Sequence, residues 1–150
     1  METRERFRER LAELFNSQKL AALSTQKDGQ PYASLVAFYA ADDAKQLFFV
    51  TPKTTRKFAN LSADSRVAVM INNSTNTDSD FHEAISVTAV GKANELTGPD
   101  KEIVLSQYLA KHPYLEDFAR AKTCALVGVS VESYFMVRNF QIVTELHMQA

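Results

Sequence analysis

The chain has 150 residues, of which 45% are hydrophobic and 23% charged, a balance typical of a globular protein and not of a disordered or membrane-spanning chain. Seventeen basic and eighteen acidic residues leave a formal net charge of -1, so no long-range positive field favours nucleic acid as a partner. The only cysteine, Cys124, excludes an intrachain disulfide and a cysteine-rich metal site, and we expect it to be a small core residue.

No segment of the sequence is predicted to enter a membrane. Residues 1–10 alternate acidic and basic side chains without an apolar core, and no apolar run approaches the ~18 residues of a transmembrane helix. We therefore expect a single cytoplasmic domain over residues 1–150, with no membrane and no nucleic acid among its partners.

The first third of the chain is predicted to form a helix and three strands. Apolar residues recur at helical spacing near the N-terminus, which indicates an amphipathic helix. The pair Asp28-Gly29 is a strong hairpin signal between two apolar segments, and a polar turn at residues 42–45 leads to a third. The helix is expected over residues 3–16 and the strands over residues 20–25, 32–40 and 46–51.

The remaining segments predict one short helix, further strands and a helical excursion. The apolar run in residues 66–71 indicates a strand buried on both faces. Alternation in residues 84–96 indicates a long strand with a bulge at Gly91, and Thr97 is expected to cap the helix that follows. A second short helix is predicted over residues 113–118, and two final strands over residues 124–131 and 133–146. Many short strands with hairpin turns favour a small closed barrel of about six antiparallel strands.

The stretch from Leu47 to Leu61 carries the strongest functional signal. Its apolar strand ends at Thr51, Pro52 is expected to stop the strand ladder, and Thr54 or Thr55 can cap a short helix. A helix N-terminus presents unpaired backbone N–H groups and a partial positive charge, which suits a phosphate. Three cations stand beside it, Lys53, Arg56 and Lys57. On this stretch alone, an ordinary surface helix with solvated basic side chains is an equal alternative.

Other chemistries lack their motifs. Four glycines at separate positions cannot form a dinucleotide-binding glycine fingerprint or a P-loop. His82, His112 and His147 have no spacing that predicts a metal site, so we expect no metal. No serine is flanked by the glycines of a nucleophile elbow, which argues against a serine hydrolase.

Five segments, taken in order, resemble the pyridoxamine 5′-phosphate oxidase-like family of FMN-binding split barrels. They are Asp28-Gly-Gln-Pro-Tyr32, Phe48-Phe-Val-Thr51, Thr55-Arg-Lys57, Asp64-Ser-Arg-Val-Ala68 and Val90-Gly-Lys-Ala93. The resemblance implies an α+β fold, a six-stranded antiparallel split β-barrel with flanking helices. It also implies FMN as cofactor, bound at the interface of a homodimer, and an oxidoreductase that acts on a small-molecule substrate or reduced nicotinamide.

The resemblance also implies a set of cofactor-binding residues. The family's Arg-Lys pair on the FMN phosphate corresponds to Arg56 and Lys57, which follow Thr55, and its strand-end pair corresponds to Val50 and Thr51. The strand beneath the flavin ring corresponds to Ser34, Leu35 and Val36, and a flavin-contacting Gln of the long strand corresponds to Ser86. No catalytic residue is implied.

The sequence departs from the family pattern at three places, which leaves alternatives open. Ser34 replaces a frequent Arg, Ser86 replaces Gln, and Arg138 lacks the following His with which the oxidase holds its substrate, so true pyridoxamine 5′-phosphate oxidase activity is not expected. A flavin- or haem-binding module without turnover is the first alternative, with His82 or His147 as the axial ligand, and a deazaflavin cofactor is the second. Near the C-terminus, Tyr134 and Phe135 either cap the flavin from the partner subunit or belong to the barrel core.

Overall fold

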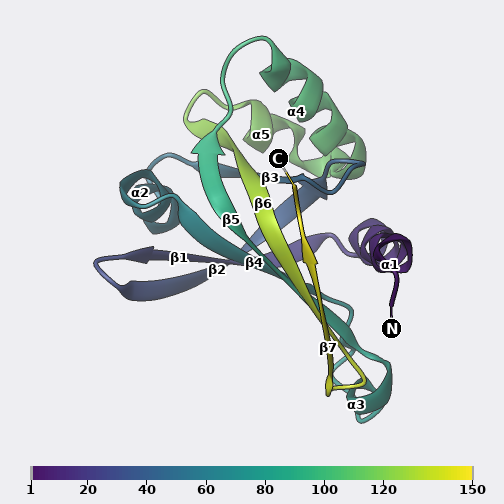
Figure 1. The fold of residues 1–150 in the computed structure, drawn as a ribbon. Helices are drawn as coiled ribbons and strands as arrows, with labels where there is room; N and C mark the ends of the chain where they lie inside the picture. The colour runs from purple at the N-terminus through teal and green to yellow at the C-terminus, as the bar shows by residue number, and fades with distance from the viewer. Residues whose placement is uncertain (1, 150) are drawn as a thin grey trace.

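The structure, a computed structural model, describes residues 2–149 and has the predicted α+β class (Figure 1). In chain order the elements are α1 (Arg4–Ser17), β1 (Leu20–Lys27), β2 (Gln30–Ala40), β3 (Gln46–Pro52), α2 (Arg56–Ala63), β4 (Arg66–Asn72), α3 (Asp80–Glu83), β5 (Ile85–Glu95), α4 (Asp100–Lys111), the 3-10 helix η1 (Pro113–Leu115), α5 (Glu116–Arg120), β6 (Cys124–Arg138) and β7 (Ile142–His147). In Figure 1, α2 lies beside the β1–β2 hairpin, and α4 and α5 lie together at the opposite end of the sheet from α3.

Six antiparallel strands close into a barrel, as predicted. The strand order is β3-β2-β1-β4-β5-β6, and a further ladder between β3 and β6 closes the ring. β7 pairs with the second half of β6 only, outside the ring. Asp28 and Gly29 turn β1 into β2 with positive φ angles of 54° and 82°, the conformation that a tight hairpin turn requires.

β6 runs without interruption from Cys124 to Arg138, whereas the sequence predicted one strand ending at Val131 and a second beginning at Ser133. A register shift at Val90/Gly91 absorbs one extra residue of β6, Glu132, so the ladder with β5 continues on both sides. Gly91 is required there, because a Cβ atom at this position would lie 2.1 Å from the carbonyl oxygen of Ser130. The predicted bulge is therefore confirmed, and the second predicted strand is divided between the end of β6 and β7.

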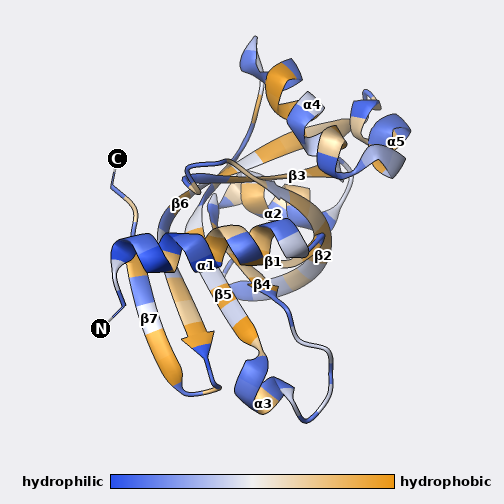
Figure 2. Ribbon diagram, turned by 90° about the vertical axis from the view of Figure 1, so that its right-hand side faces the viewer, coloured by the Kyte–Doolittle hydropathy of each residue, from blue (hydrophilic) through white to orange (hydrophobic). Residues whose placement is uncertain are grey.

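Alternate strand positions fill the barrel. Leu23, Val69, Ala89 and Tyr134 oppose one another across four neighbouring strands and are almost fully buried. The hydroxyl of Tyr134 donates to the carbonyl oxygen of Ala44 at 2.7 Å, so Tyr134 is a core residue. The apolar stripe of α1 covers one end of this core, and Figure 2 shows hydrophobic and hydrophilic segments alternating along that helix.

The strand ladder of β3 ends at Pro52, opposite Cys124, as predicted, because a proline at a strand end need not donate to the ladder. Two other local predictions are wrong. β4 is buried on one face only, since Met70 on the other face is 42% exposed. Thr97 does not cap α4, which begins after Pro99 without a side-chain cap.

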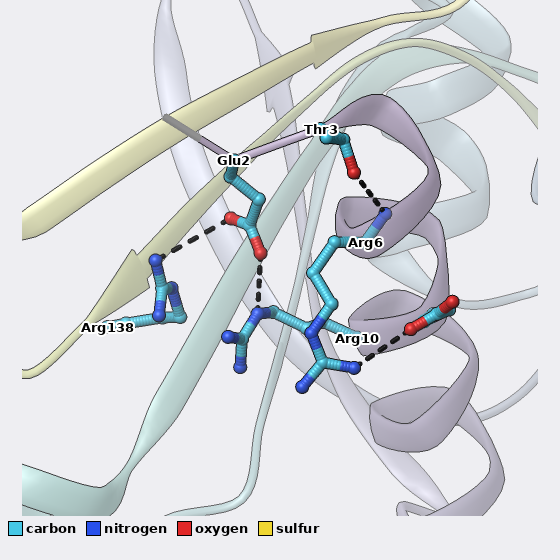
Figure 3. Close-up of polar contacts among 6 residues, drawn as sticks. Glu2, Thr3, Arg6, Arg10 and Arg138 are labelled. Carbon is cyan, nitrogen blue, oxygen red and sulfur yellow. Dashed lines mark hydrogen bonds and ion pairs between the residues drawn. The ribbon is translucent and has the colours of Figure 1, made fainter.

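The N-terminal residues tie α1 to the end of β6 (Figure 3). The carboxylate of Glu2 lies 2.5 Å from Nε of Arg10 and 3.6 Å from Nη2 of Arg138. Thr3 caps α1 by accepting a hydrogen bond from the backbone N–H of Arg6. The guanidinium of Arg138 is therefore paired with the carboxylate of Glu2. In the family resemblance, Arg138 corresponds to the Arg with which the oxidase holds its substrate.

Candidate functional site

The barrel is split where β2 separates from β3. The two strands pair only through Phe38–Ala40 of β2, while residues 30–37 pair with β1 on the other side. If the register continued, Val50 and Thr51 would oppose Ala37 and Val36, but no ladder forms there. One edge of β2 therefore keeps unpaired backbone N–H and C=O groups in the split.

The start of α2 closes this split. Thr55 has extended backbone angles and its hydroxyl oxygen accepts a hydrogen bond from the backbone N–H of Phe58 at 3.3 Å, which makes it the N-cap. The same hydroxyl donates to the carbonyl oxygen of Pro52 at 2.9 Å and lies 2.8 Å from the hydroxyl of the buried Thr51. The backbone N–H groups of Arg56 and Lys57, in the first turn, have no intrahelical acceptor. The strand end and the helix start thus form one rigid unit.

A second set of contacts fixes α2 against the β1–β2 hairpin. Asn60, one turn after Arg56, is only 5% exposed, and its side-chain amide donates to the hydroxyl of Thr25 at 3.1 Å. That hydroxyl donates in turn to the carbonyl oxygen of Tyr32 at 3.4 Å. The guanidinium of Arg56 lies over the Tyr32 ring, 5.5 Å from its centroid. Arg56 and Asn60 share one face of α2, so both contacts act together.

A cleft of ≈ 630 Å³ lies between the hairpin and α2. Arg56, Thr55, Tyr32 and Asn60 line it, together with hairpin residues that include Lys27. Both polar and apolar groups face this cleft, among them the guanidinium of Arg56 and the ring of Tyr32.

The far end of α2 is anchored by Asp64. Its carboxylate accepts two hydrogen bonds from the Arg66 guanidinium, at 2.7 and 3.0 Å, and a further one from the side chain of Gln26. The bonds from Arg66 hold the pKa of Asp64 well below its usual range. Because Gln26 belongs to β1 and Arg66 begins β4, Asp64 joins α2 to two strands.

Most of the residues implied by the resemblance meet around the split. Those that do are Ser34, Val36, Val50, Thr51, Thr55, Arg56 and Lys57. Leu35 projects to the opposite face of β2 and is 66% exposed. Ser86 pairs with β4 and β6, three strands away from β2, and lies about 14 Å from it at ~4.8 Å per strand. Lys53 turns away, and its ammonium pairs with Glu95 at 3.6 Å.

Thr25, Tyr32 and Asn60 are not among the cofactor-binding residues expected from the sequence. Tyr32 enters there only as the end of the Asp28–Tyr32 segment, and Thr25 and Asn60 belong to no motif. The spacing of Asn60, four residues after Arg56, is a usable signal, because residues four apart share a helix face. Thr25 could not be found, since its contact with Asn60 depends on how α2 packs against β1.

A family model described as pyridoxamine 5′-phosphate oxidase matches residues 7–138. The chain belongs to the pyridoxamine 5′-phosphate oxidase family. No curated protein matches the sequence. None of the helices within residues 2–149 is long and apolar enough to cross a membrane.

Solved structures share the fold of this family member at low identity. A haem-binding protein from Mycobacterium smegmatis is 15% identical, with a TM-score of 0.79 over 91% of this chain, which spans only 56% of that protein. HutZ, the haem storage protein of Vibrio cholerae, is 17% identical, with a TM-score of 0.70 over 83% of this chain and 89% of HutZ. An FAD-binding protein from Mesorhizobium loti is 16% identical, with a TM-score of 0.66 and the same coverages of 83% and 89%. At these identities the likeness establishes the fold alone.

Proposed function

We propose that the chain is a single-domain flavoprotein that binds FMN, with the phosphate at the N-terminus of α2 against Arg56 and Lys57. The supporting observation is the meeting of a capped helix start with an unpaired strand edge in the split between β2 and β3. A phosphate needs the first of these features, and the polar edge of a flavin ring can use the second.

The residues at the split fit both parts of FMN. A phosphomonoester carries close to two negative charges, which suit a guanidinium, an ammonium and the N–H groups of a helix start. Ser34, on the same face of β2 as Tyr32, has a buried hydroxyl oxygen without a hydrogen-bond partner within residues 2–149, as expected of a group that serves a polar ligand. Val36 and Val50, on the two sides of the split, are each only 6% exposed and belong to two separate apolar clusters.

The proposed activity is an FMN-dependent oxidoreductase with an unidentified small substrate or reduced nicotinamide as reaction partner. Bound FMN would supply hydride transfer at its ring. The chain contributes placement: α2 holds the phosphate, the free edge of β2 orients the ring, and apolar side chains exclude water. Oxidation of pyridoxamine 5′-phosphate itself is not proposed, because position 140 is Phe and Arg138 is paired with Glu2.

A homodimer with FMN at the subunit interface completes the proposal. Leu20, Leu35 and Met70 project from the outer face of β1, β2 and β4 and are 51%, 66% and 42% exposed. Apolar exposure of this kind on neighbouring strands marks an interaction surface. Ser86 lies on the same face, so a second copy of the chain could bring its own Ser86 toward the flavin.

The double variant Arg56→Ala, Lys57→Ala tests the phosphate site. We expect the wild-type protein to bind FMN with a Kd of about 1 μM or tighter, and the variant to bind about 100-fold more weakly, since two charge-assisted contacts are worth ~1.5 kcal/mol or more each. Visible absorption of the flavin reports the binding. Lys53→Ala is the matched control, because the ammonium of Lys53 pairs with Glu95. Equal affinity in all three proteins would contradict the proposed site.

Haem binding is the second candidate, favoured by one observation. The carboxylate of Glu145 lies 3.1 Å from Nε2 of His147, and a carboxylate that orients an imidazole in this way is typical of metal ligands; Nδ1, 2.7 Å from the hydroxyl of Ser133, would have to exchange that contact for the iron. His82 lies exposed in α3 and has no comparable side-chain contact among the described hydrogen bonds. A haem Soret band that His147→Ala abolishes, together with failure to bind FMN, would favour this candidate. A deazaflavin is expected only if FMN and haem both fail to bind.

A further inference from the structure

The ladder between β2 and β3 ends where the split begins, and the backbone geometry identifies the hydrogen bond that is missing there. Backbone groups of successive strand residues point to opposite sides of the strand. The N–H of Phe38 donates to the carbonyl oxygen of Lys19, beside β1, so the backbone groups of Ala37 point toward β3. Phe38 opposes Phe49, so Val50 would be the partner of Ala37 if the register continued. A bond from the Val50 N–H to the Ala37 carbonyl would therefore be the first step of closing the split.

The side chain of Tyr108, on α4, takes the place of this missing N–H. Its hydroxyl donates to the carbonyl oxygen of Ala37 at 3.2 Å. Tyr108 is only 1% exposed and belongs to the same apolar cluster as Val50, with Ala37 packed against that cluster. Burial raises the pKa of Tyr108 to about 12, so the hydroxyl keeps the proton that it donates. A side chain of α4 thus stands at the inner end of the split, where a strand N–H would otherwise close it.

Two further contacts hold α4 in this position. His112, the C-cap residue of α4, is only 6% exposed, and its Nε2 atom lies 2.7 Å from the carbonyl oxygen of Phe38. A carbonyl oxygen only accepts, so Nε2 carries the proton. The rings of Tyr108 and His112 pack together with their centroids 4.9 Å apart. The ammonium of Lys111 donates to the carbonyl oxygen of Phe15 at 2.9 Å, which ties the same end of α4 to α1. The Tyr108 hydroxyl therefore cannot leave the split unless these contacts break.

We propose that Tyr108 is a positioning residue for the ring of the bound cofactor. Its hydroxyl holds the carbonyl of Ala37, so the β2–β3 ladder does not extend past Phe38, and this point sets how far the ring enters the split. The role rests on the proposed flavin function, since it concerns the same split. It differs from the roles of Arg56 and Lys57, which act on the phosphate at the α2 end.

The split has a side-chain hydroxyl at each end. At the α2 end, Thr55 donates to the carbonyl oxygen of Pro52 at 2.9 Å, and this carbonyl points to the same side of β3 as the backbone groups of Val50. By the same alternation, backbone groups of Leu35 on β2 and of Val50 on β3 face the split between the two ends, where the two strands form no ladder. Such groups need partners when water is excluded, and a flat ring with a polar edge supplies them. Tyr108 and Thr55 therefore define the length of strand edge that a ligand can use.

The first test measures amide hydrogen exchange by NMR in the full-length protein without FMN. Tyr108→Phe keeps the buried ring and removes only the hydroxyl. We expect exchange of the Val50 amide to slow about tenfold in this variant, because the released carbonyl of Ala37 accepts the Val50 N–H and the ladder gains one pair. Tyr114→Phe, at a tyrosine that is 97% exposed, is the matched control and should leave the rate unchanged. If the wild-type Val50 amide already exchanges as slowly as that of Tyr39, inside the ladder, the split is closed and the proposal fails.

The second test compares the affinities for FMN and riboflavin in the same proteins. Tyr108→Phe should weaken both ligands about fivefold and leave their ratio unchanged, because it alters the ring site, whereas Arg56→Ala should weaken FMN alone. Thermal melting of each variant shows whether a lost affinity reflects unfolding. Normal flavin binding by Tyr108→Phe, with an unchanged Val50 exchange rate, overturns the role of Tyr108 alone. Failure of the wild-type protein to bind either flavin overturns the proposed flavin function, and the positioning role with it.

Discussion

Asn60 donates its side-chain amide to the hydroxyl of Thr25 at 3.1 Å, and this buried bond fixes the angle between α2 and the β1–β2 hairpin. Arg56, one turn earlier on the same helix face, lines the cleft and belongs to the proposed phosphate site. The position of the Arg56 guanidinium therefore depends on the hydrogen bond between Asn60 and Thr25, two residues that are not proposed to bind the phosphate.

Replacing Asn60 is expected to weaken both the fold and FMN binding. Asn60→Ala removes a buried hydrogen bond, so the free energy of unfolding should fall by about 1–3 kcal/mol in urea denaturation. The affinity for FMN should fall with it, because α2 loses its anchor. Asn94→Ala, at an exposed position of β5, is the control and should change neither quantity. A stable Asn60→Ala protein with normal FMN affinity would show that the anchor is unnecessary.

Replacing Tyr32 is expected to weaken binding of the FMN phosphate and not binding of the flavin ring. A cation–π contact at an exposed site is worth ~0.5–1 kcal/mol, so Tyr32→Leu should weaken FMN binding about two- to fivefold. Riboflavin, which lacks the phosphate, should bind equally to both proteins, and Tyr32→Phe should retain the wild-type ratio of FMN to riboflavin affinity. General damage to the site would instead weaken both ligands together.

Asp64 predicts a pH dependence of stability. Its folded-state pKa is depressed by Arg66, so its contribution to stability is present above the pKa of the unfolded chain and is lost as the pH falls through the folded pKa. Asp64→Asn should therefore be less stable than wild type at pH 7, and the difference should shrink below about pH 4. Parallel denaturation curves at all pH values would contradict this reading.

The outer face of the sheet predicts the oligomeric state. Leu35→Asp with Met70→Asp should convert a dimer to a monomer in light-scattering chromatography, because two charges would be buried without partners. Ile103→Asp, an equally exposed apolar position on α4, is the control and should leave the dimer intact. A wild-type protein that is monomeric at micromolar concentration would exclude the proposed interface.

Local patterns determine much of this fold before any tertiary contact is considered. The helical stripe of α1, the Asp28-Gly29 turn, the Thr55 cap and the Gly91 bulge were all readable, because each is set by spacing or by backbone conformation. The continuity of β6 could not be predicted from the sequence, since it depends on the partner strand.

Some positions in the candidate site could likewise be predicted from local sequence, and others could not. The residues from Val50 to Lys57 are contiguous, so their joint position at a strand end and helix start follows from the local sequence. The separation of Ser86 from β2 follows from the strand order β2-β1-β4-β5, which no local pattern encodes. The contact of Ser133 with His147 depends on the β6–β7 register in the same sense.

An equilibrium titration of the wild-type protein with FMN, followed by flavin fluorescence, tests the central claim most directly. We expect saturable binding of one FMN per chain with a Kd of about 1 μM or tighter, and weaker binding of riboflavin because it lacks the phosphate held by Arg56 and Lys57. No binding at micromolar concentration, or equal affinity for FMN and riboflavin, would contradict a phosphate site at the start of α2.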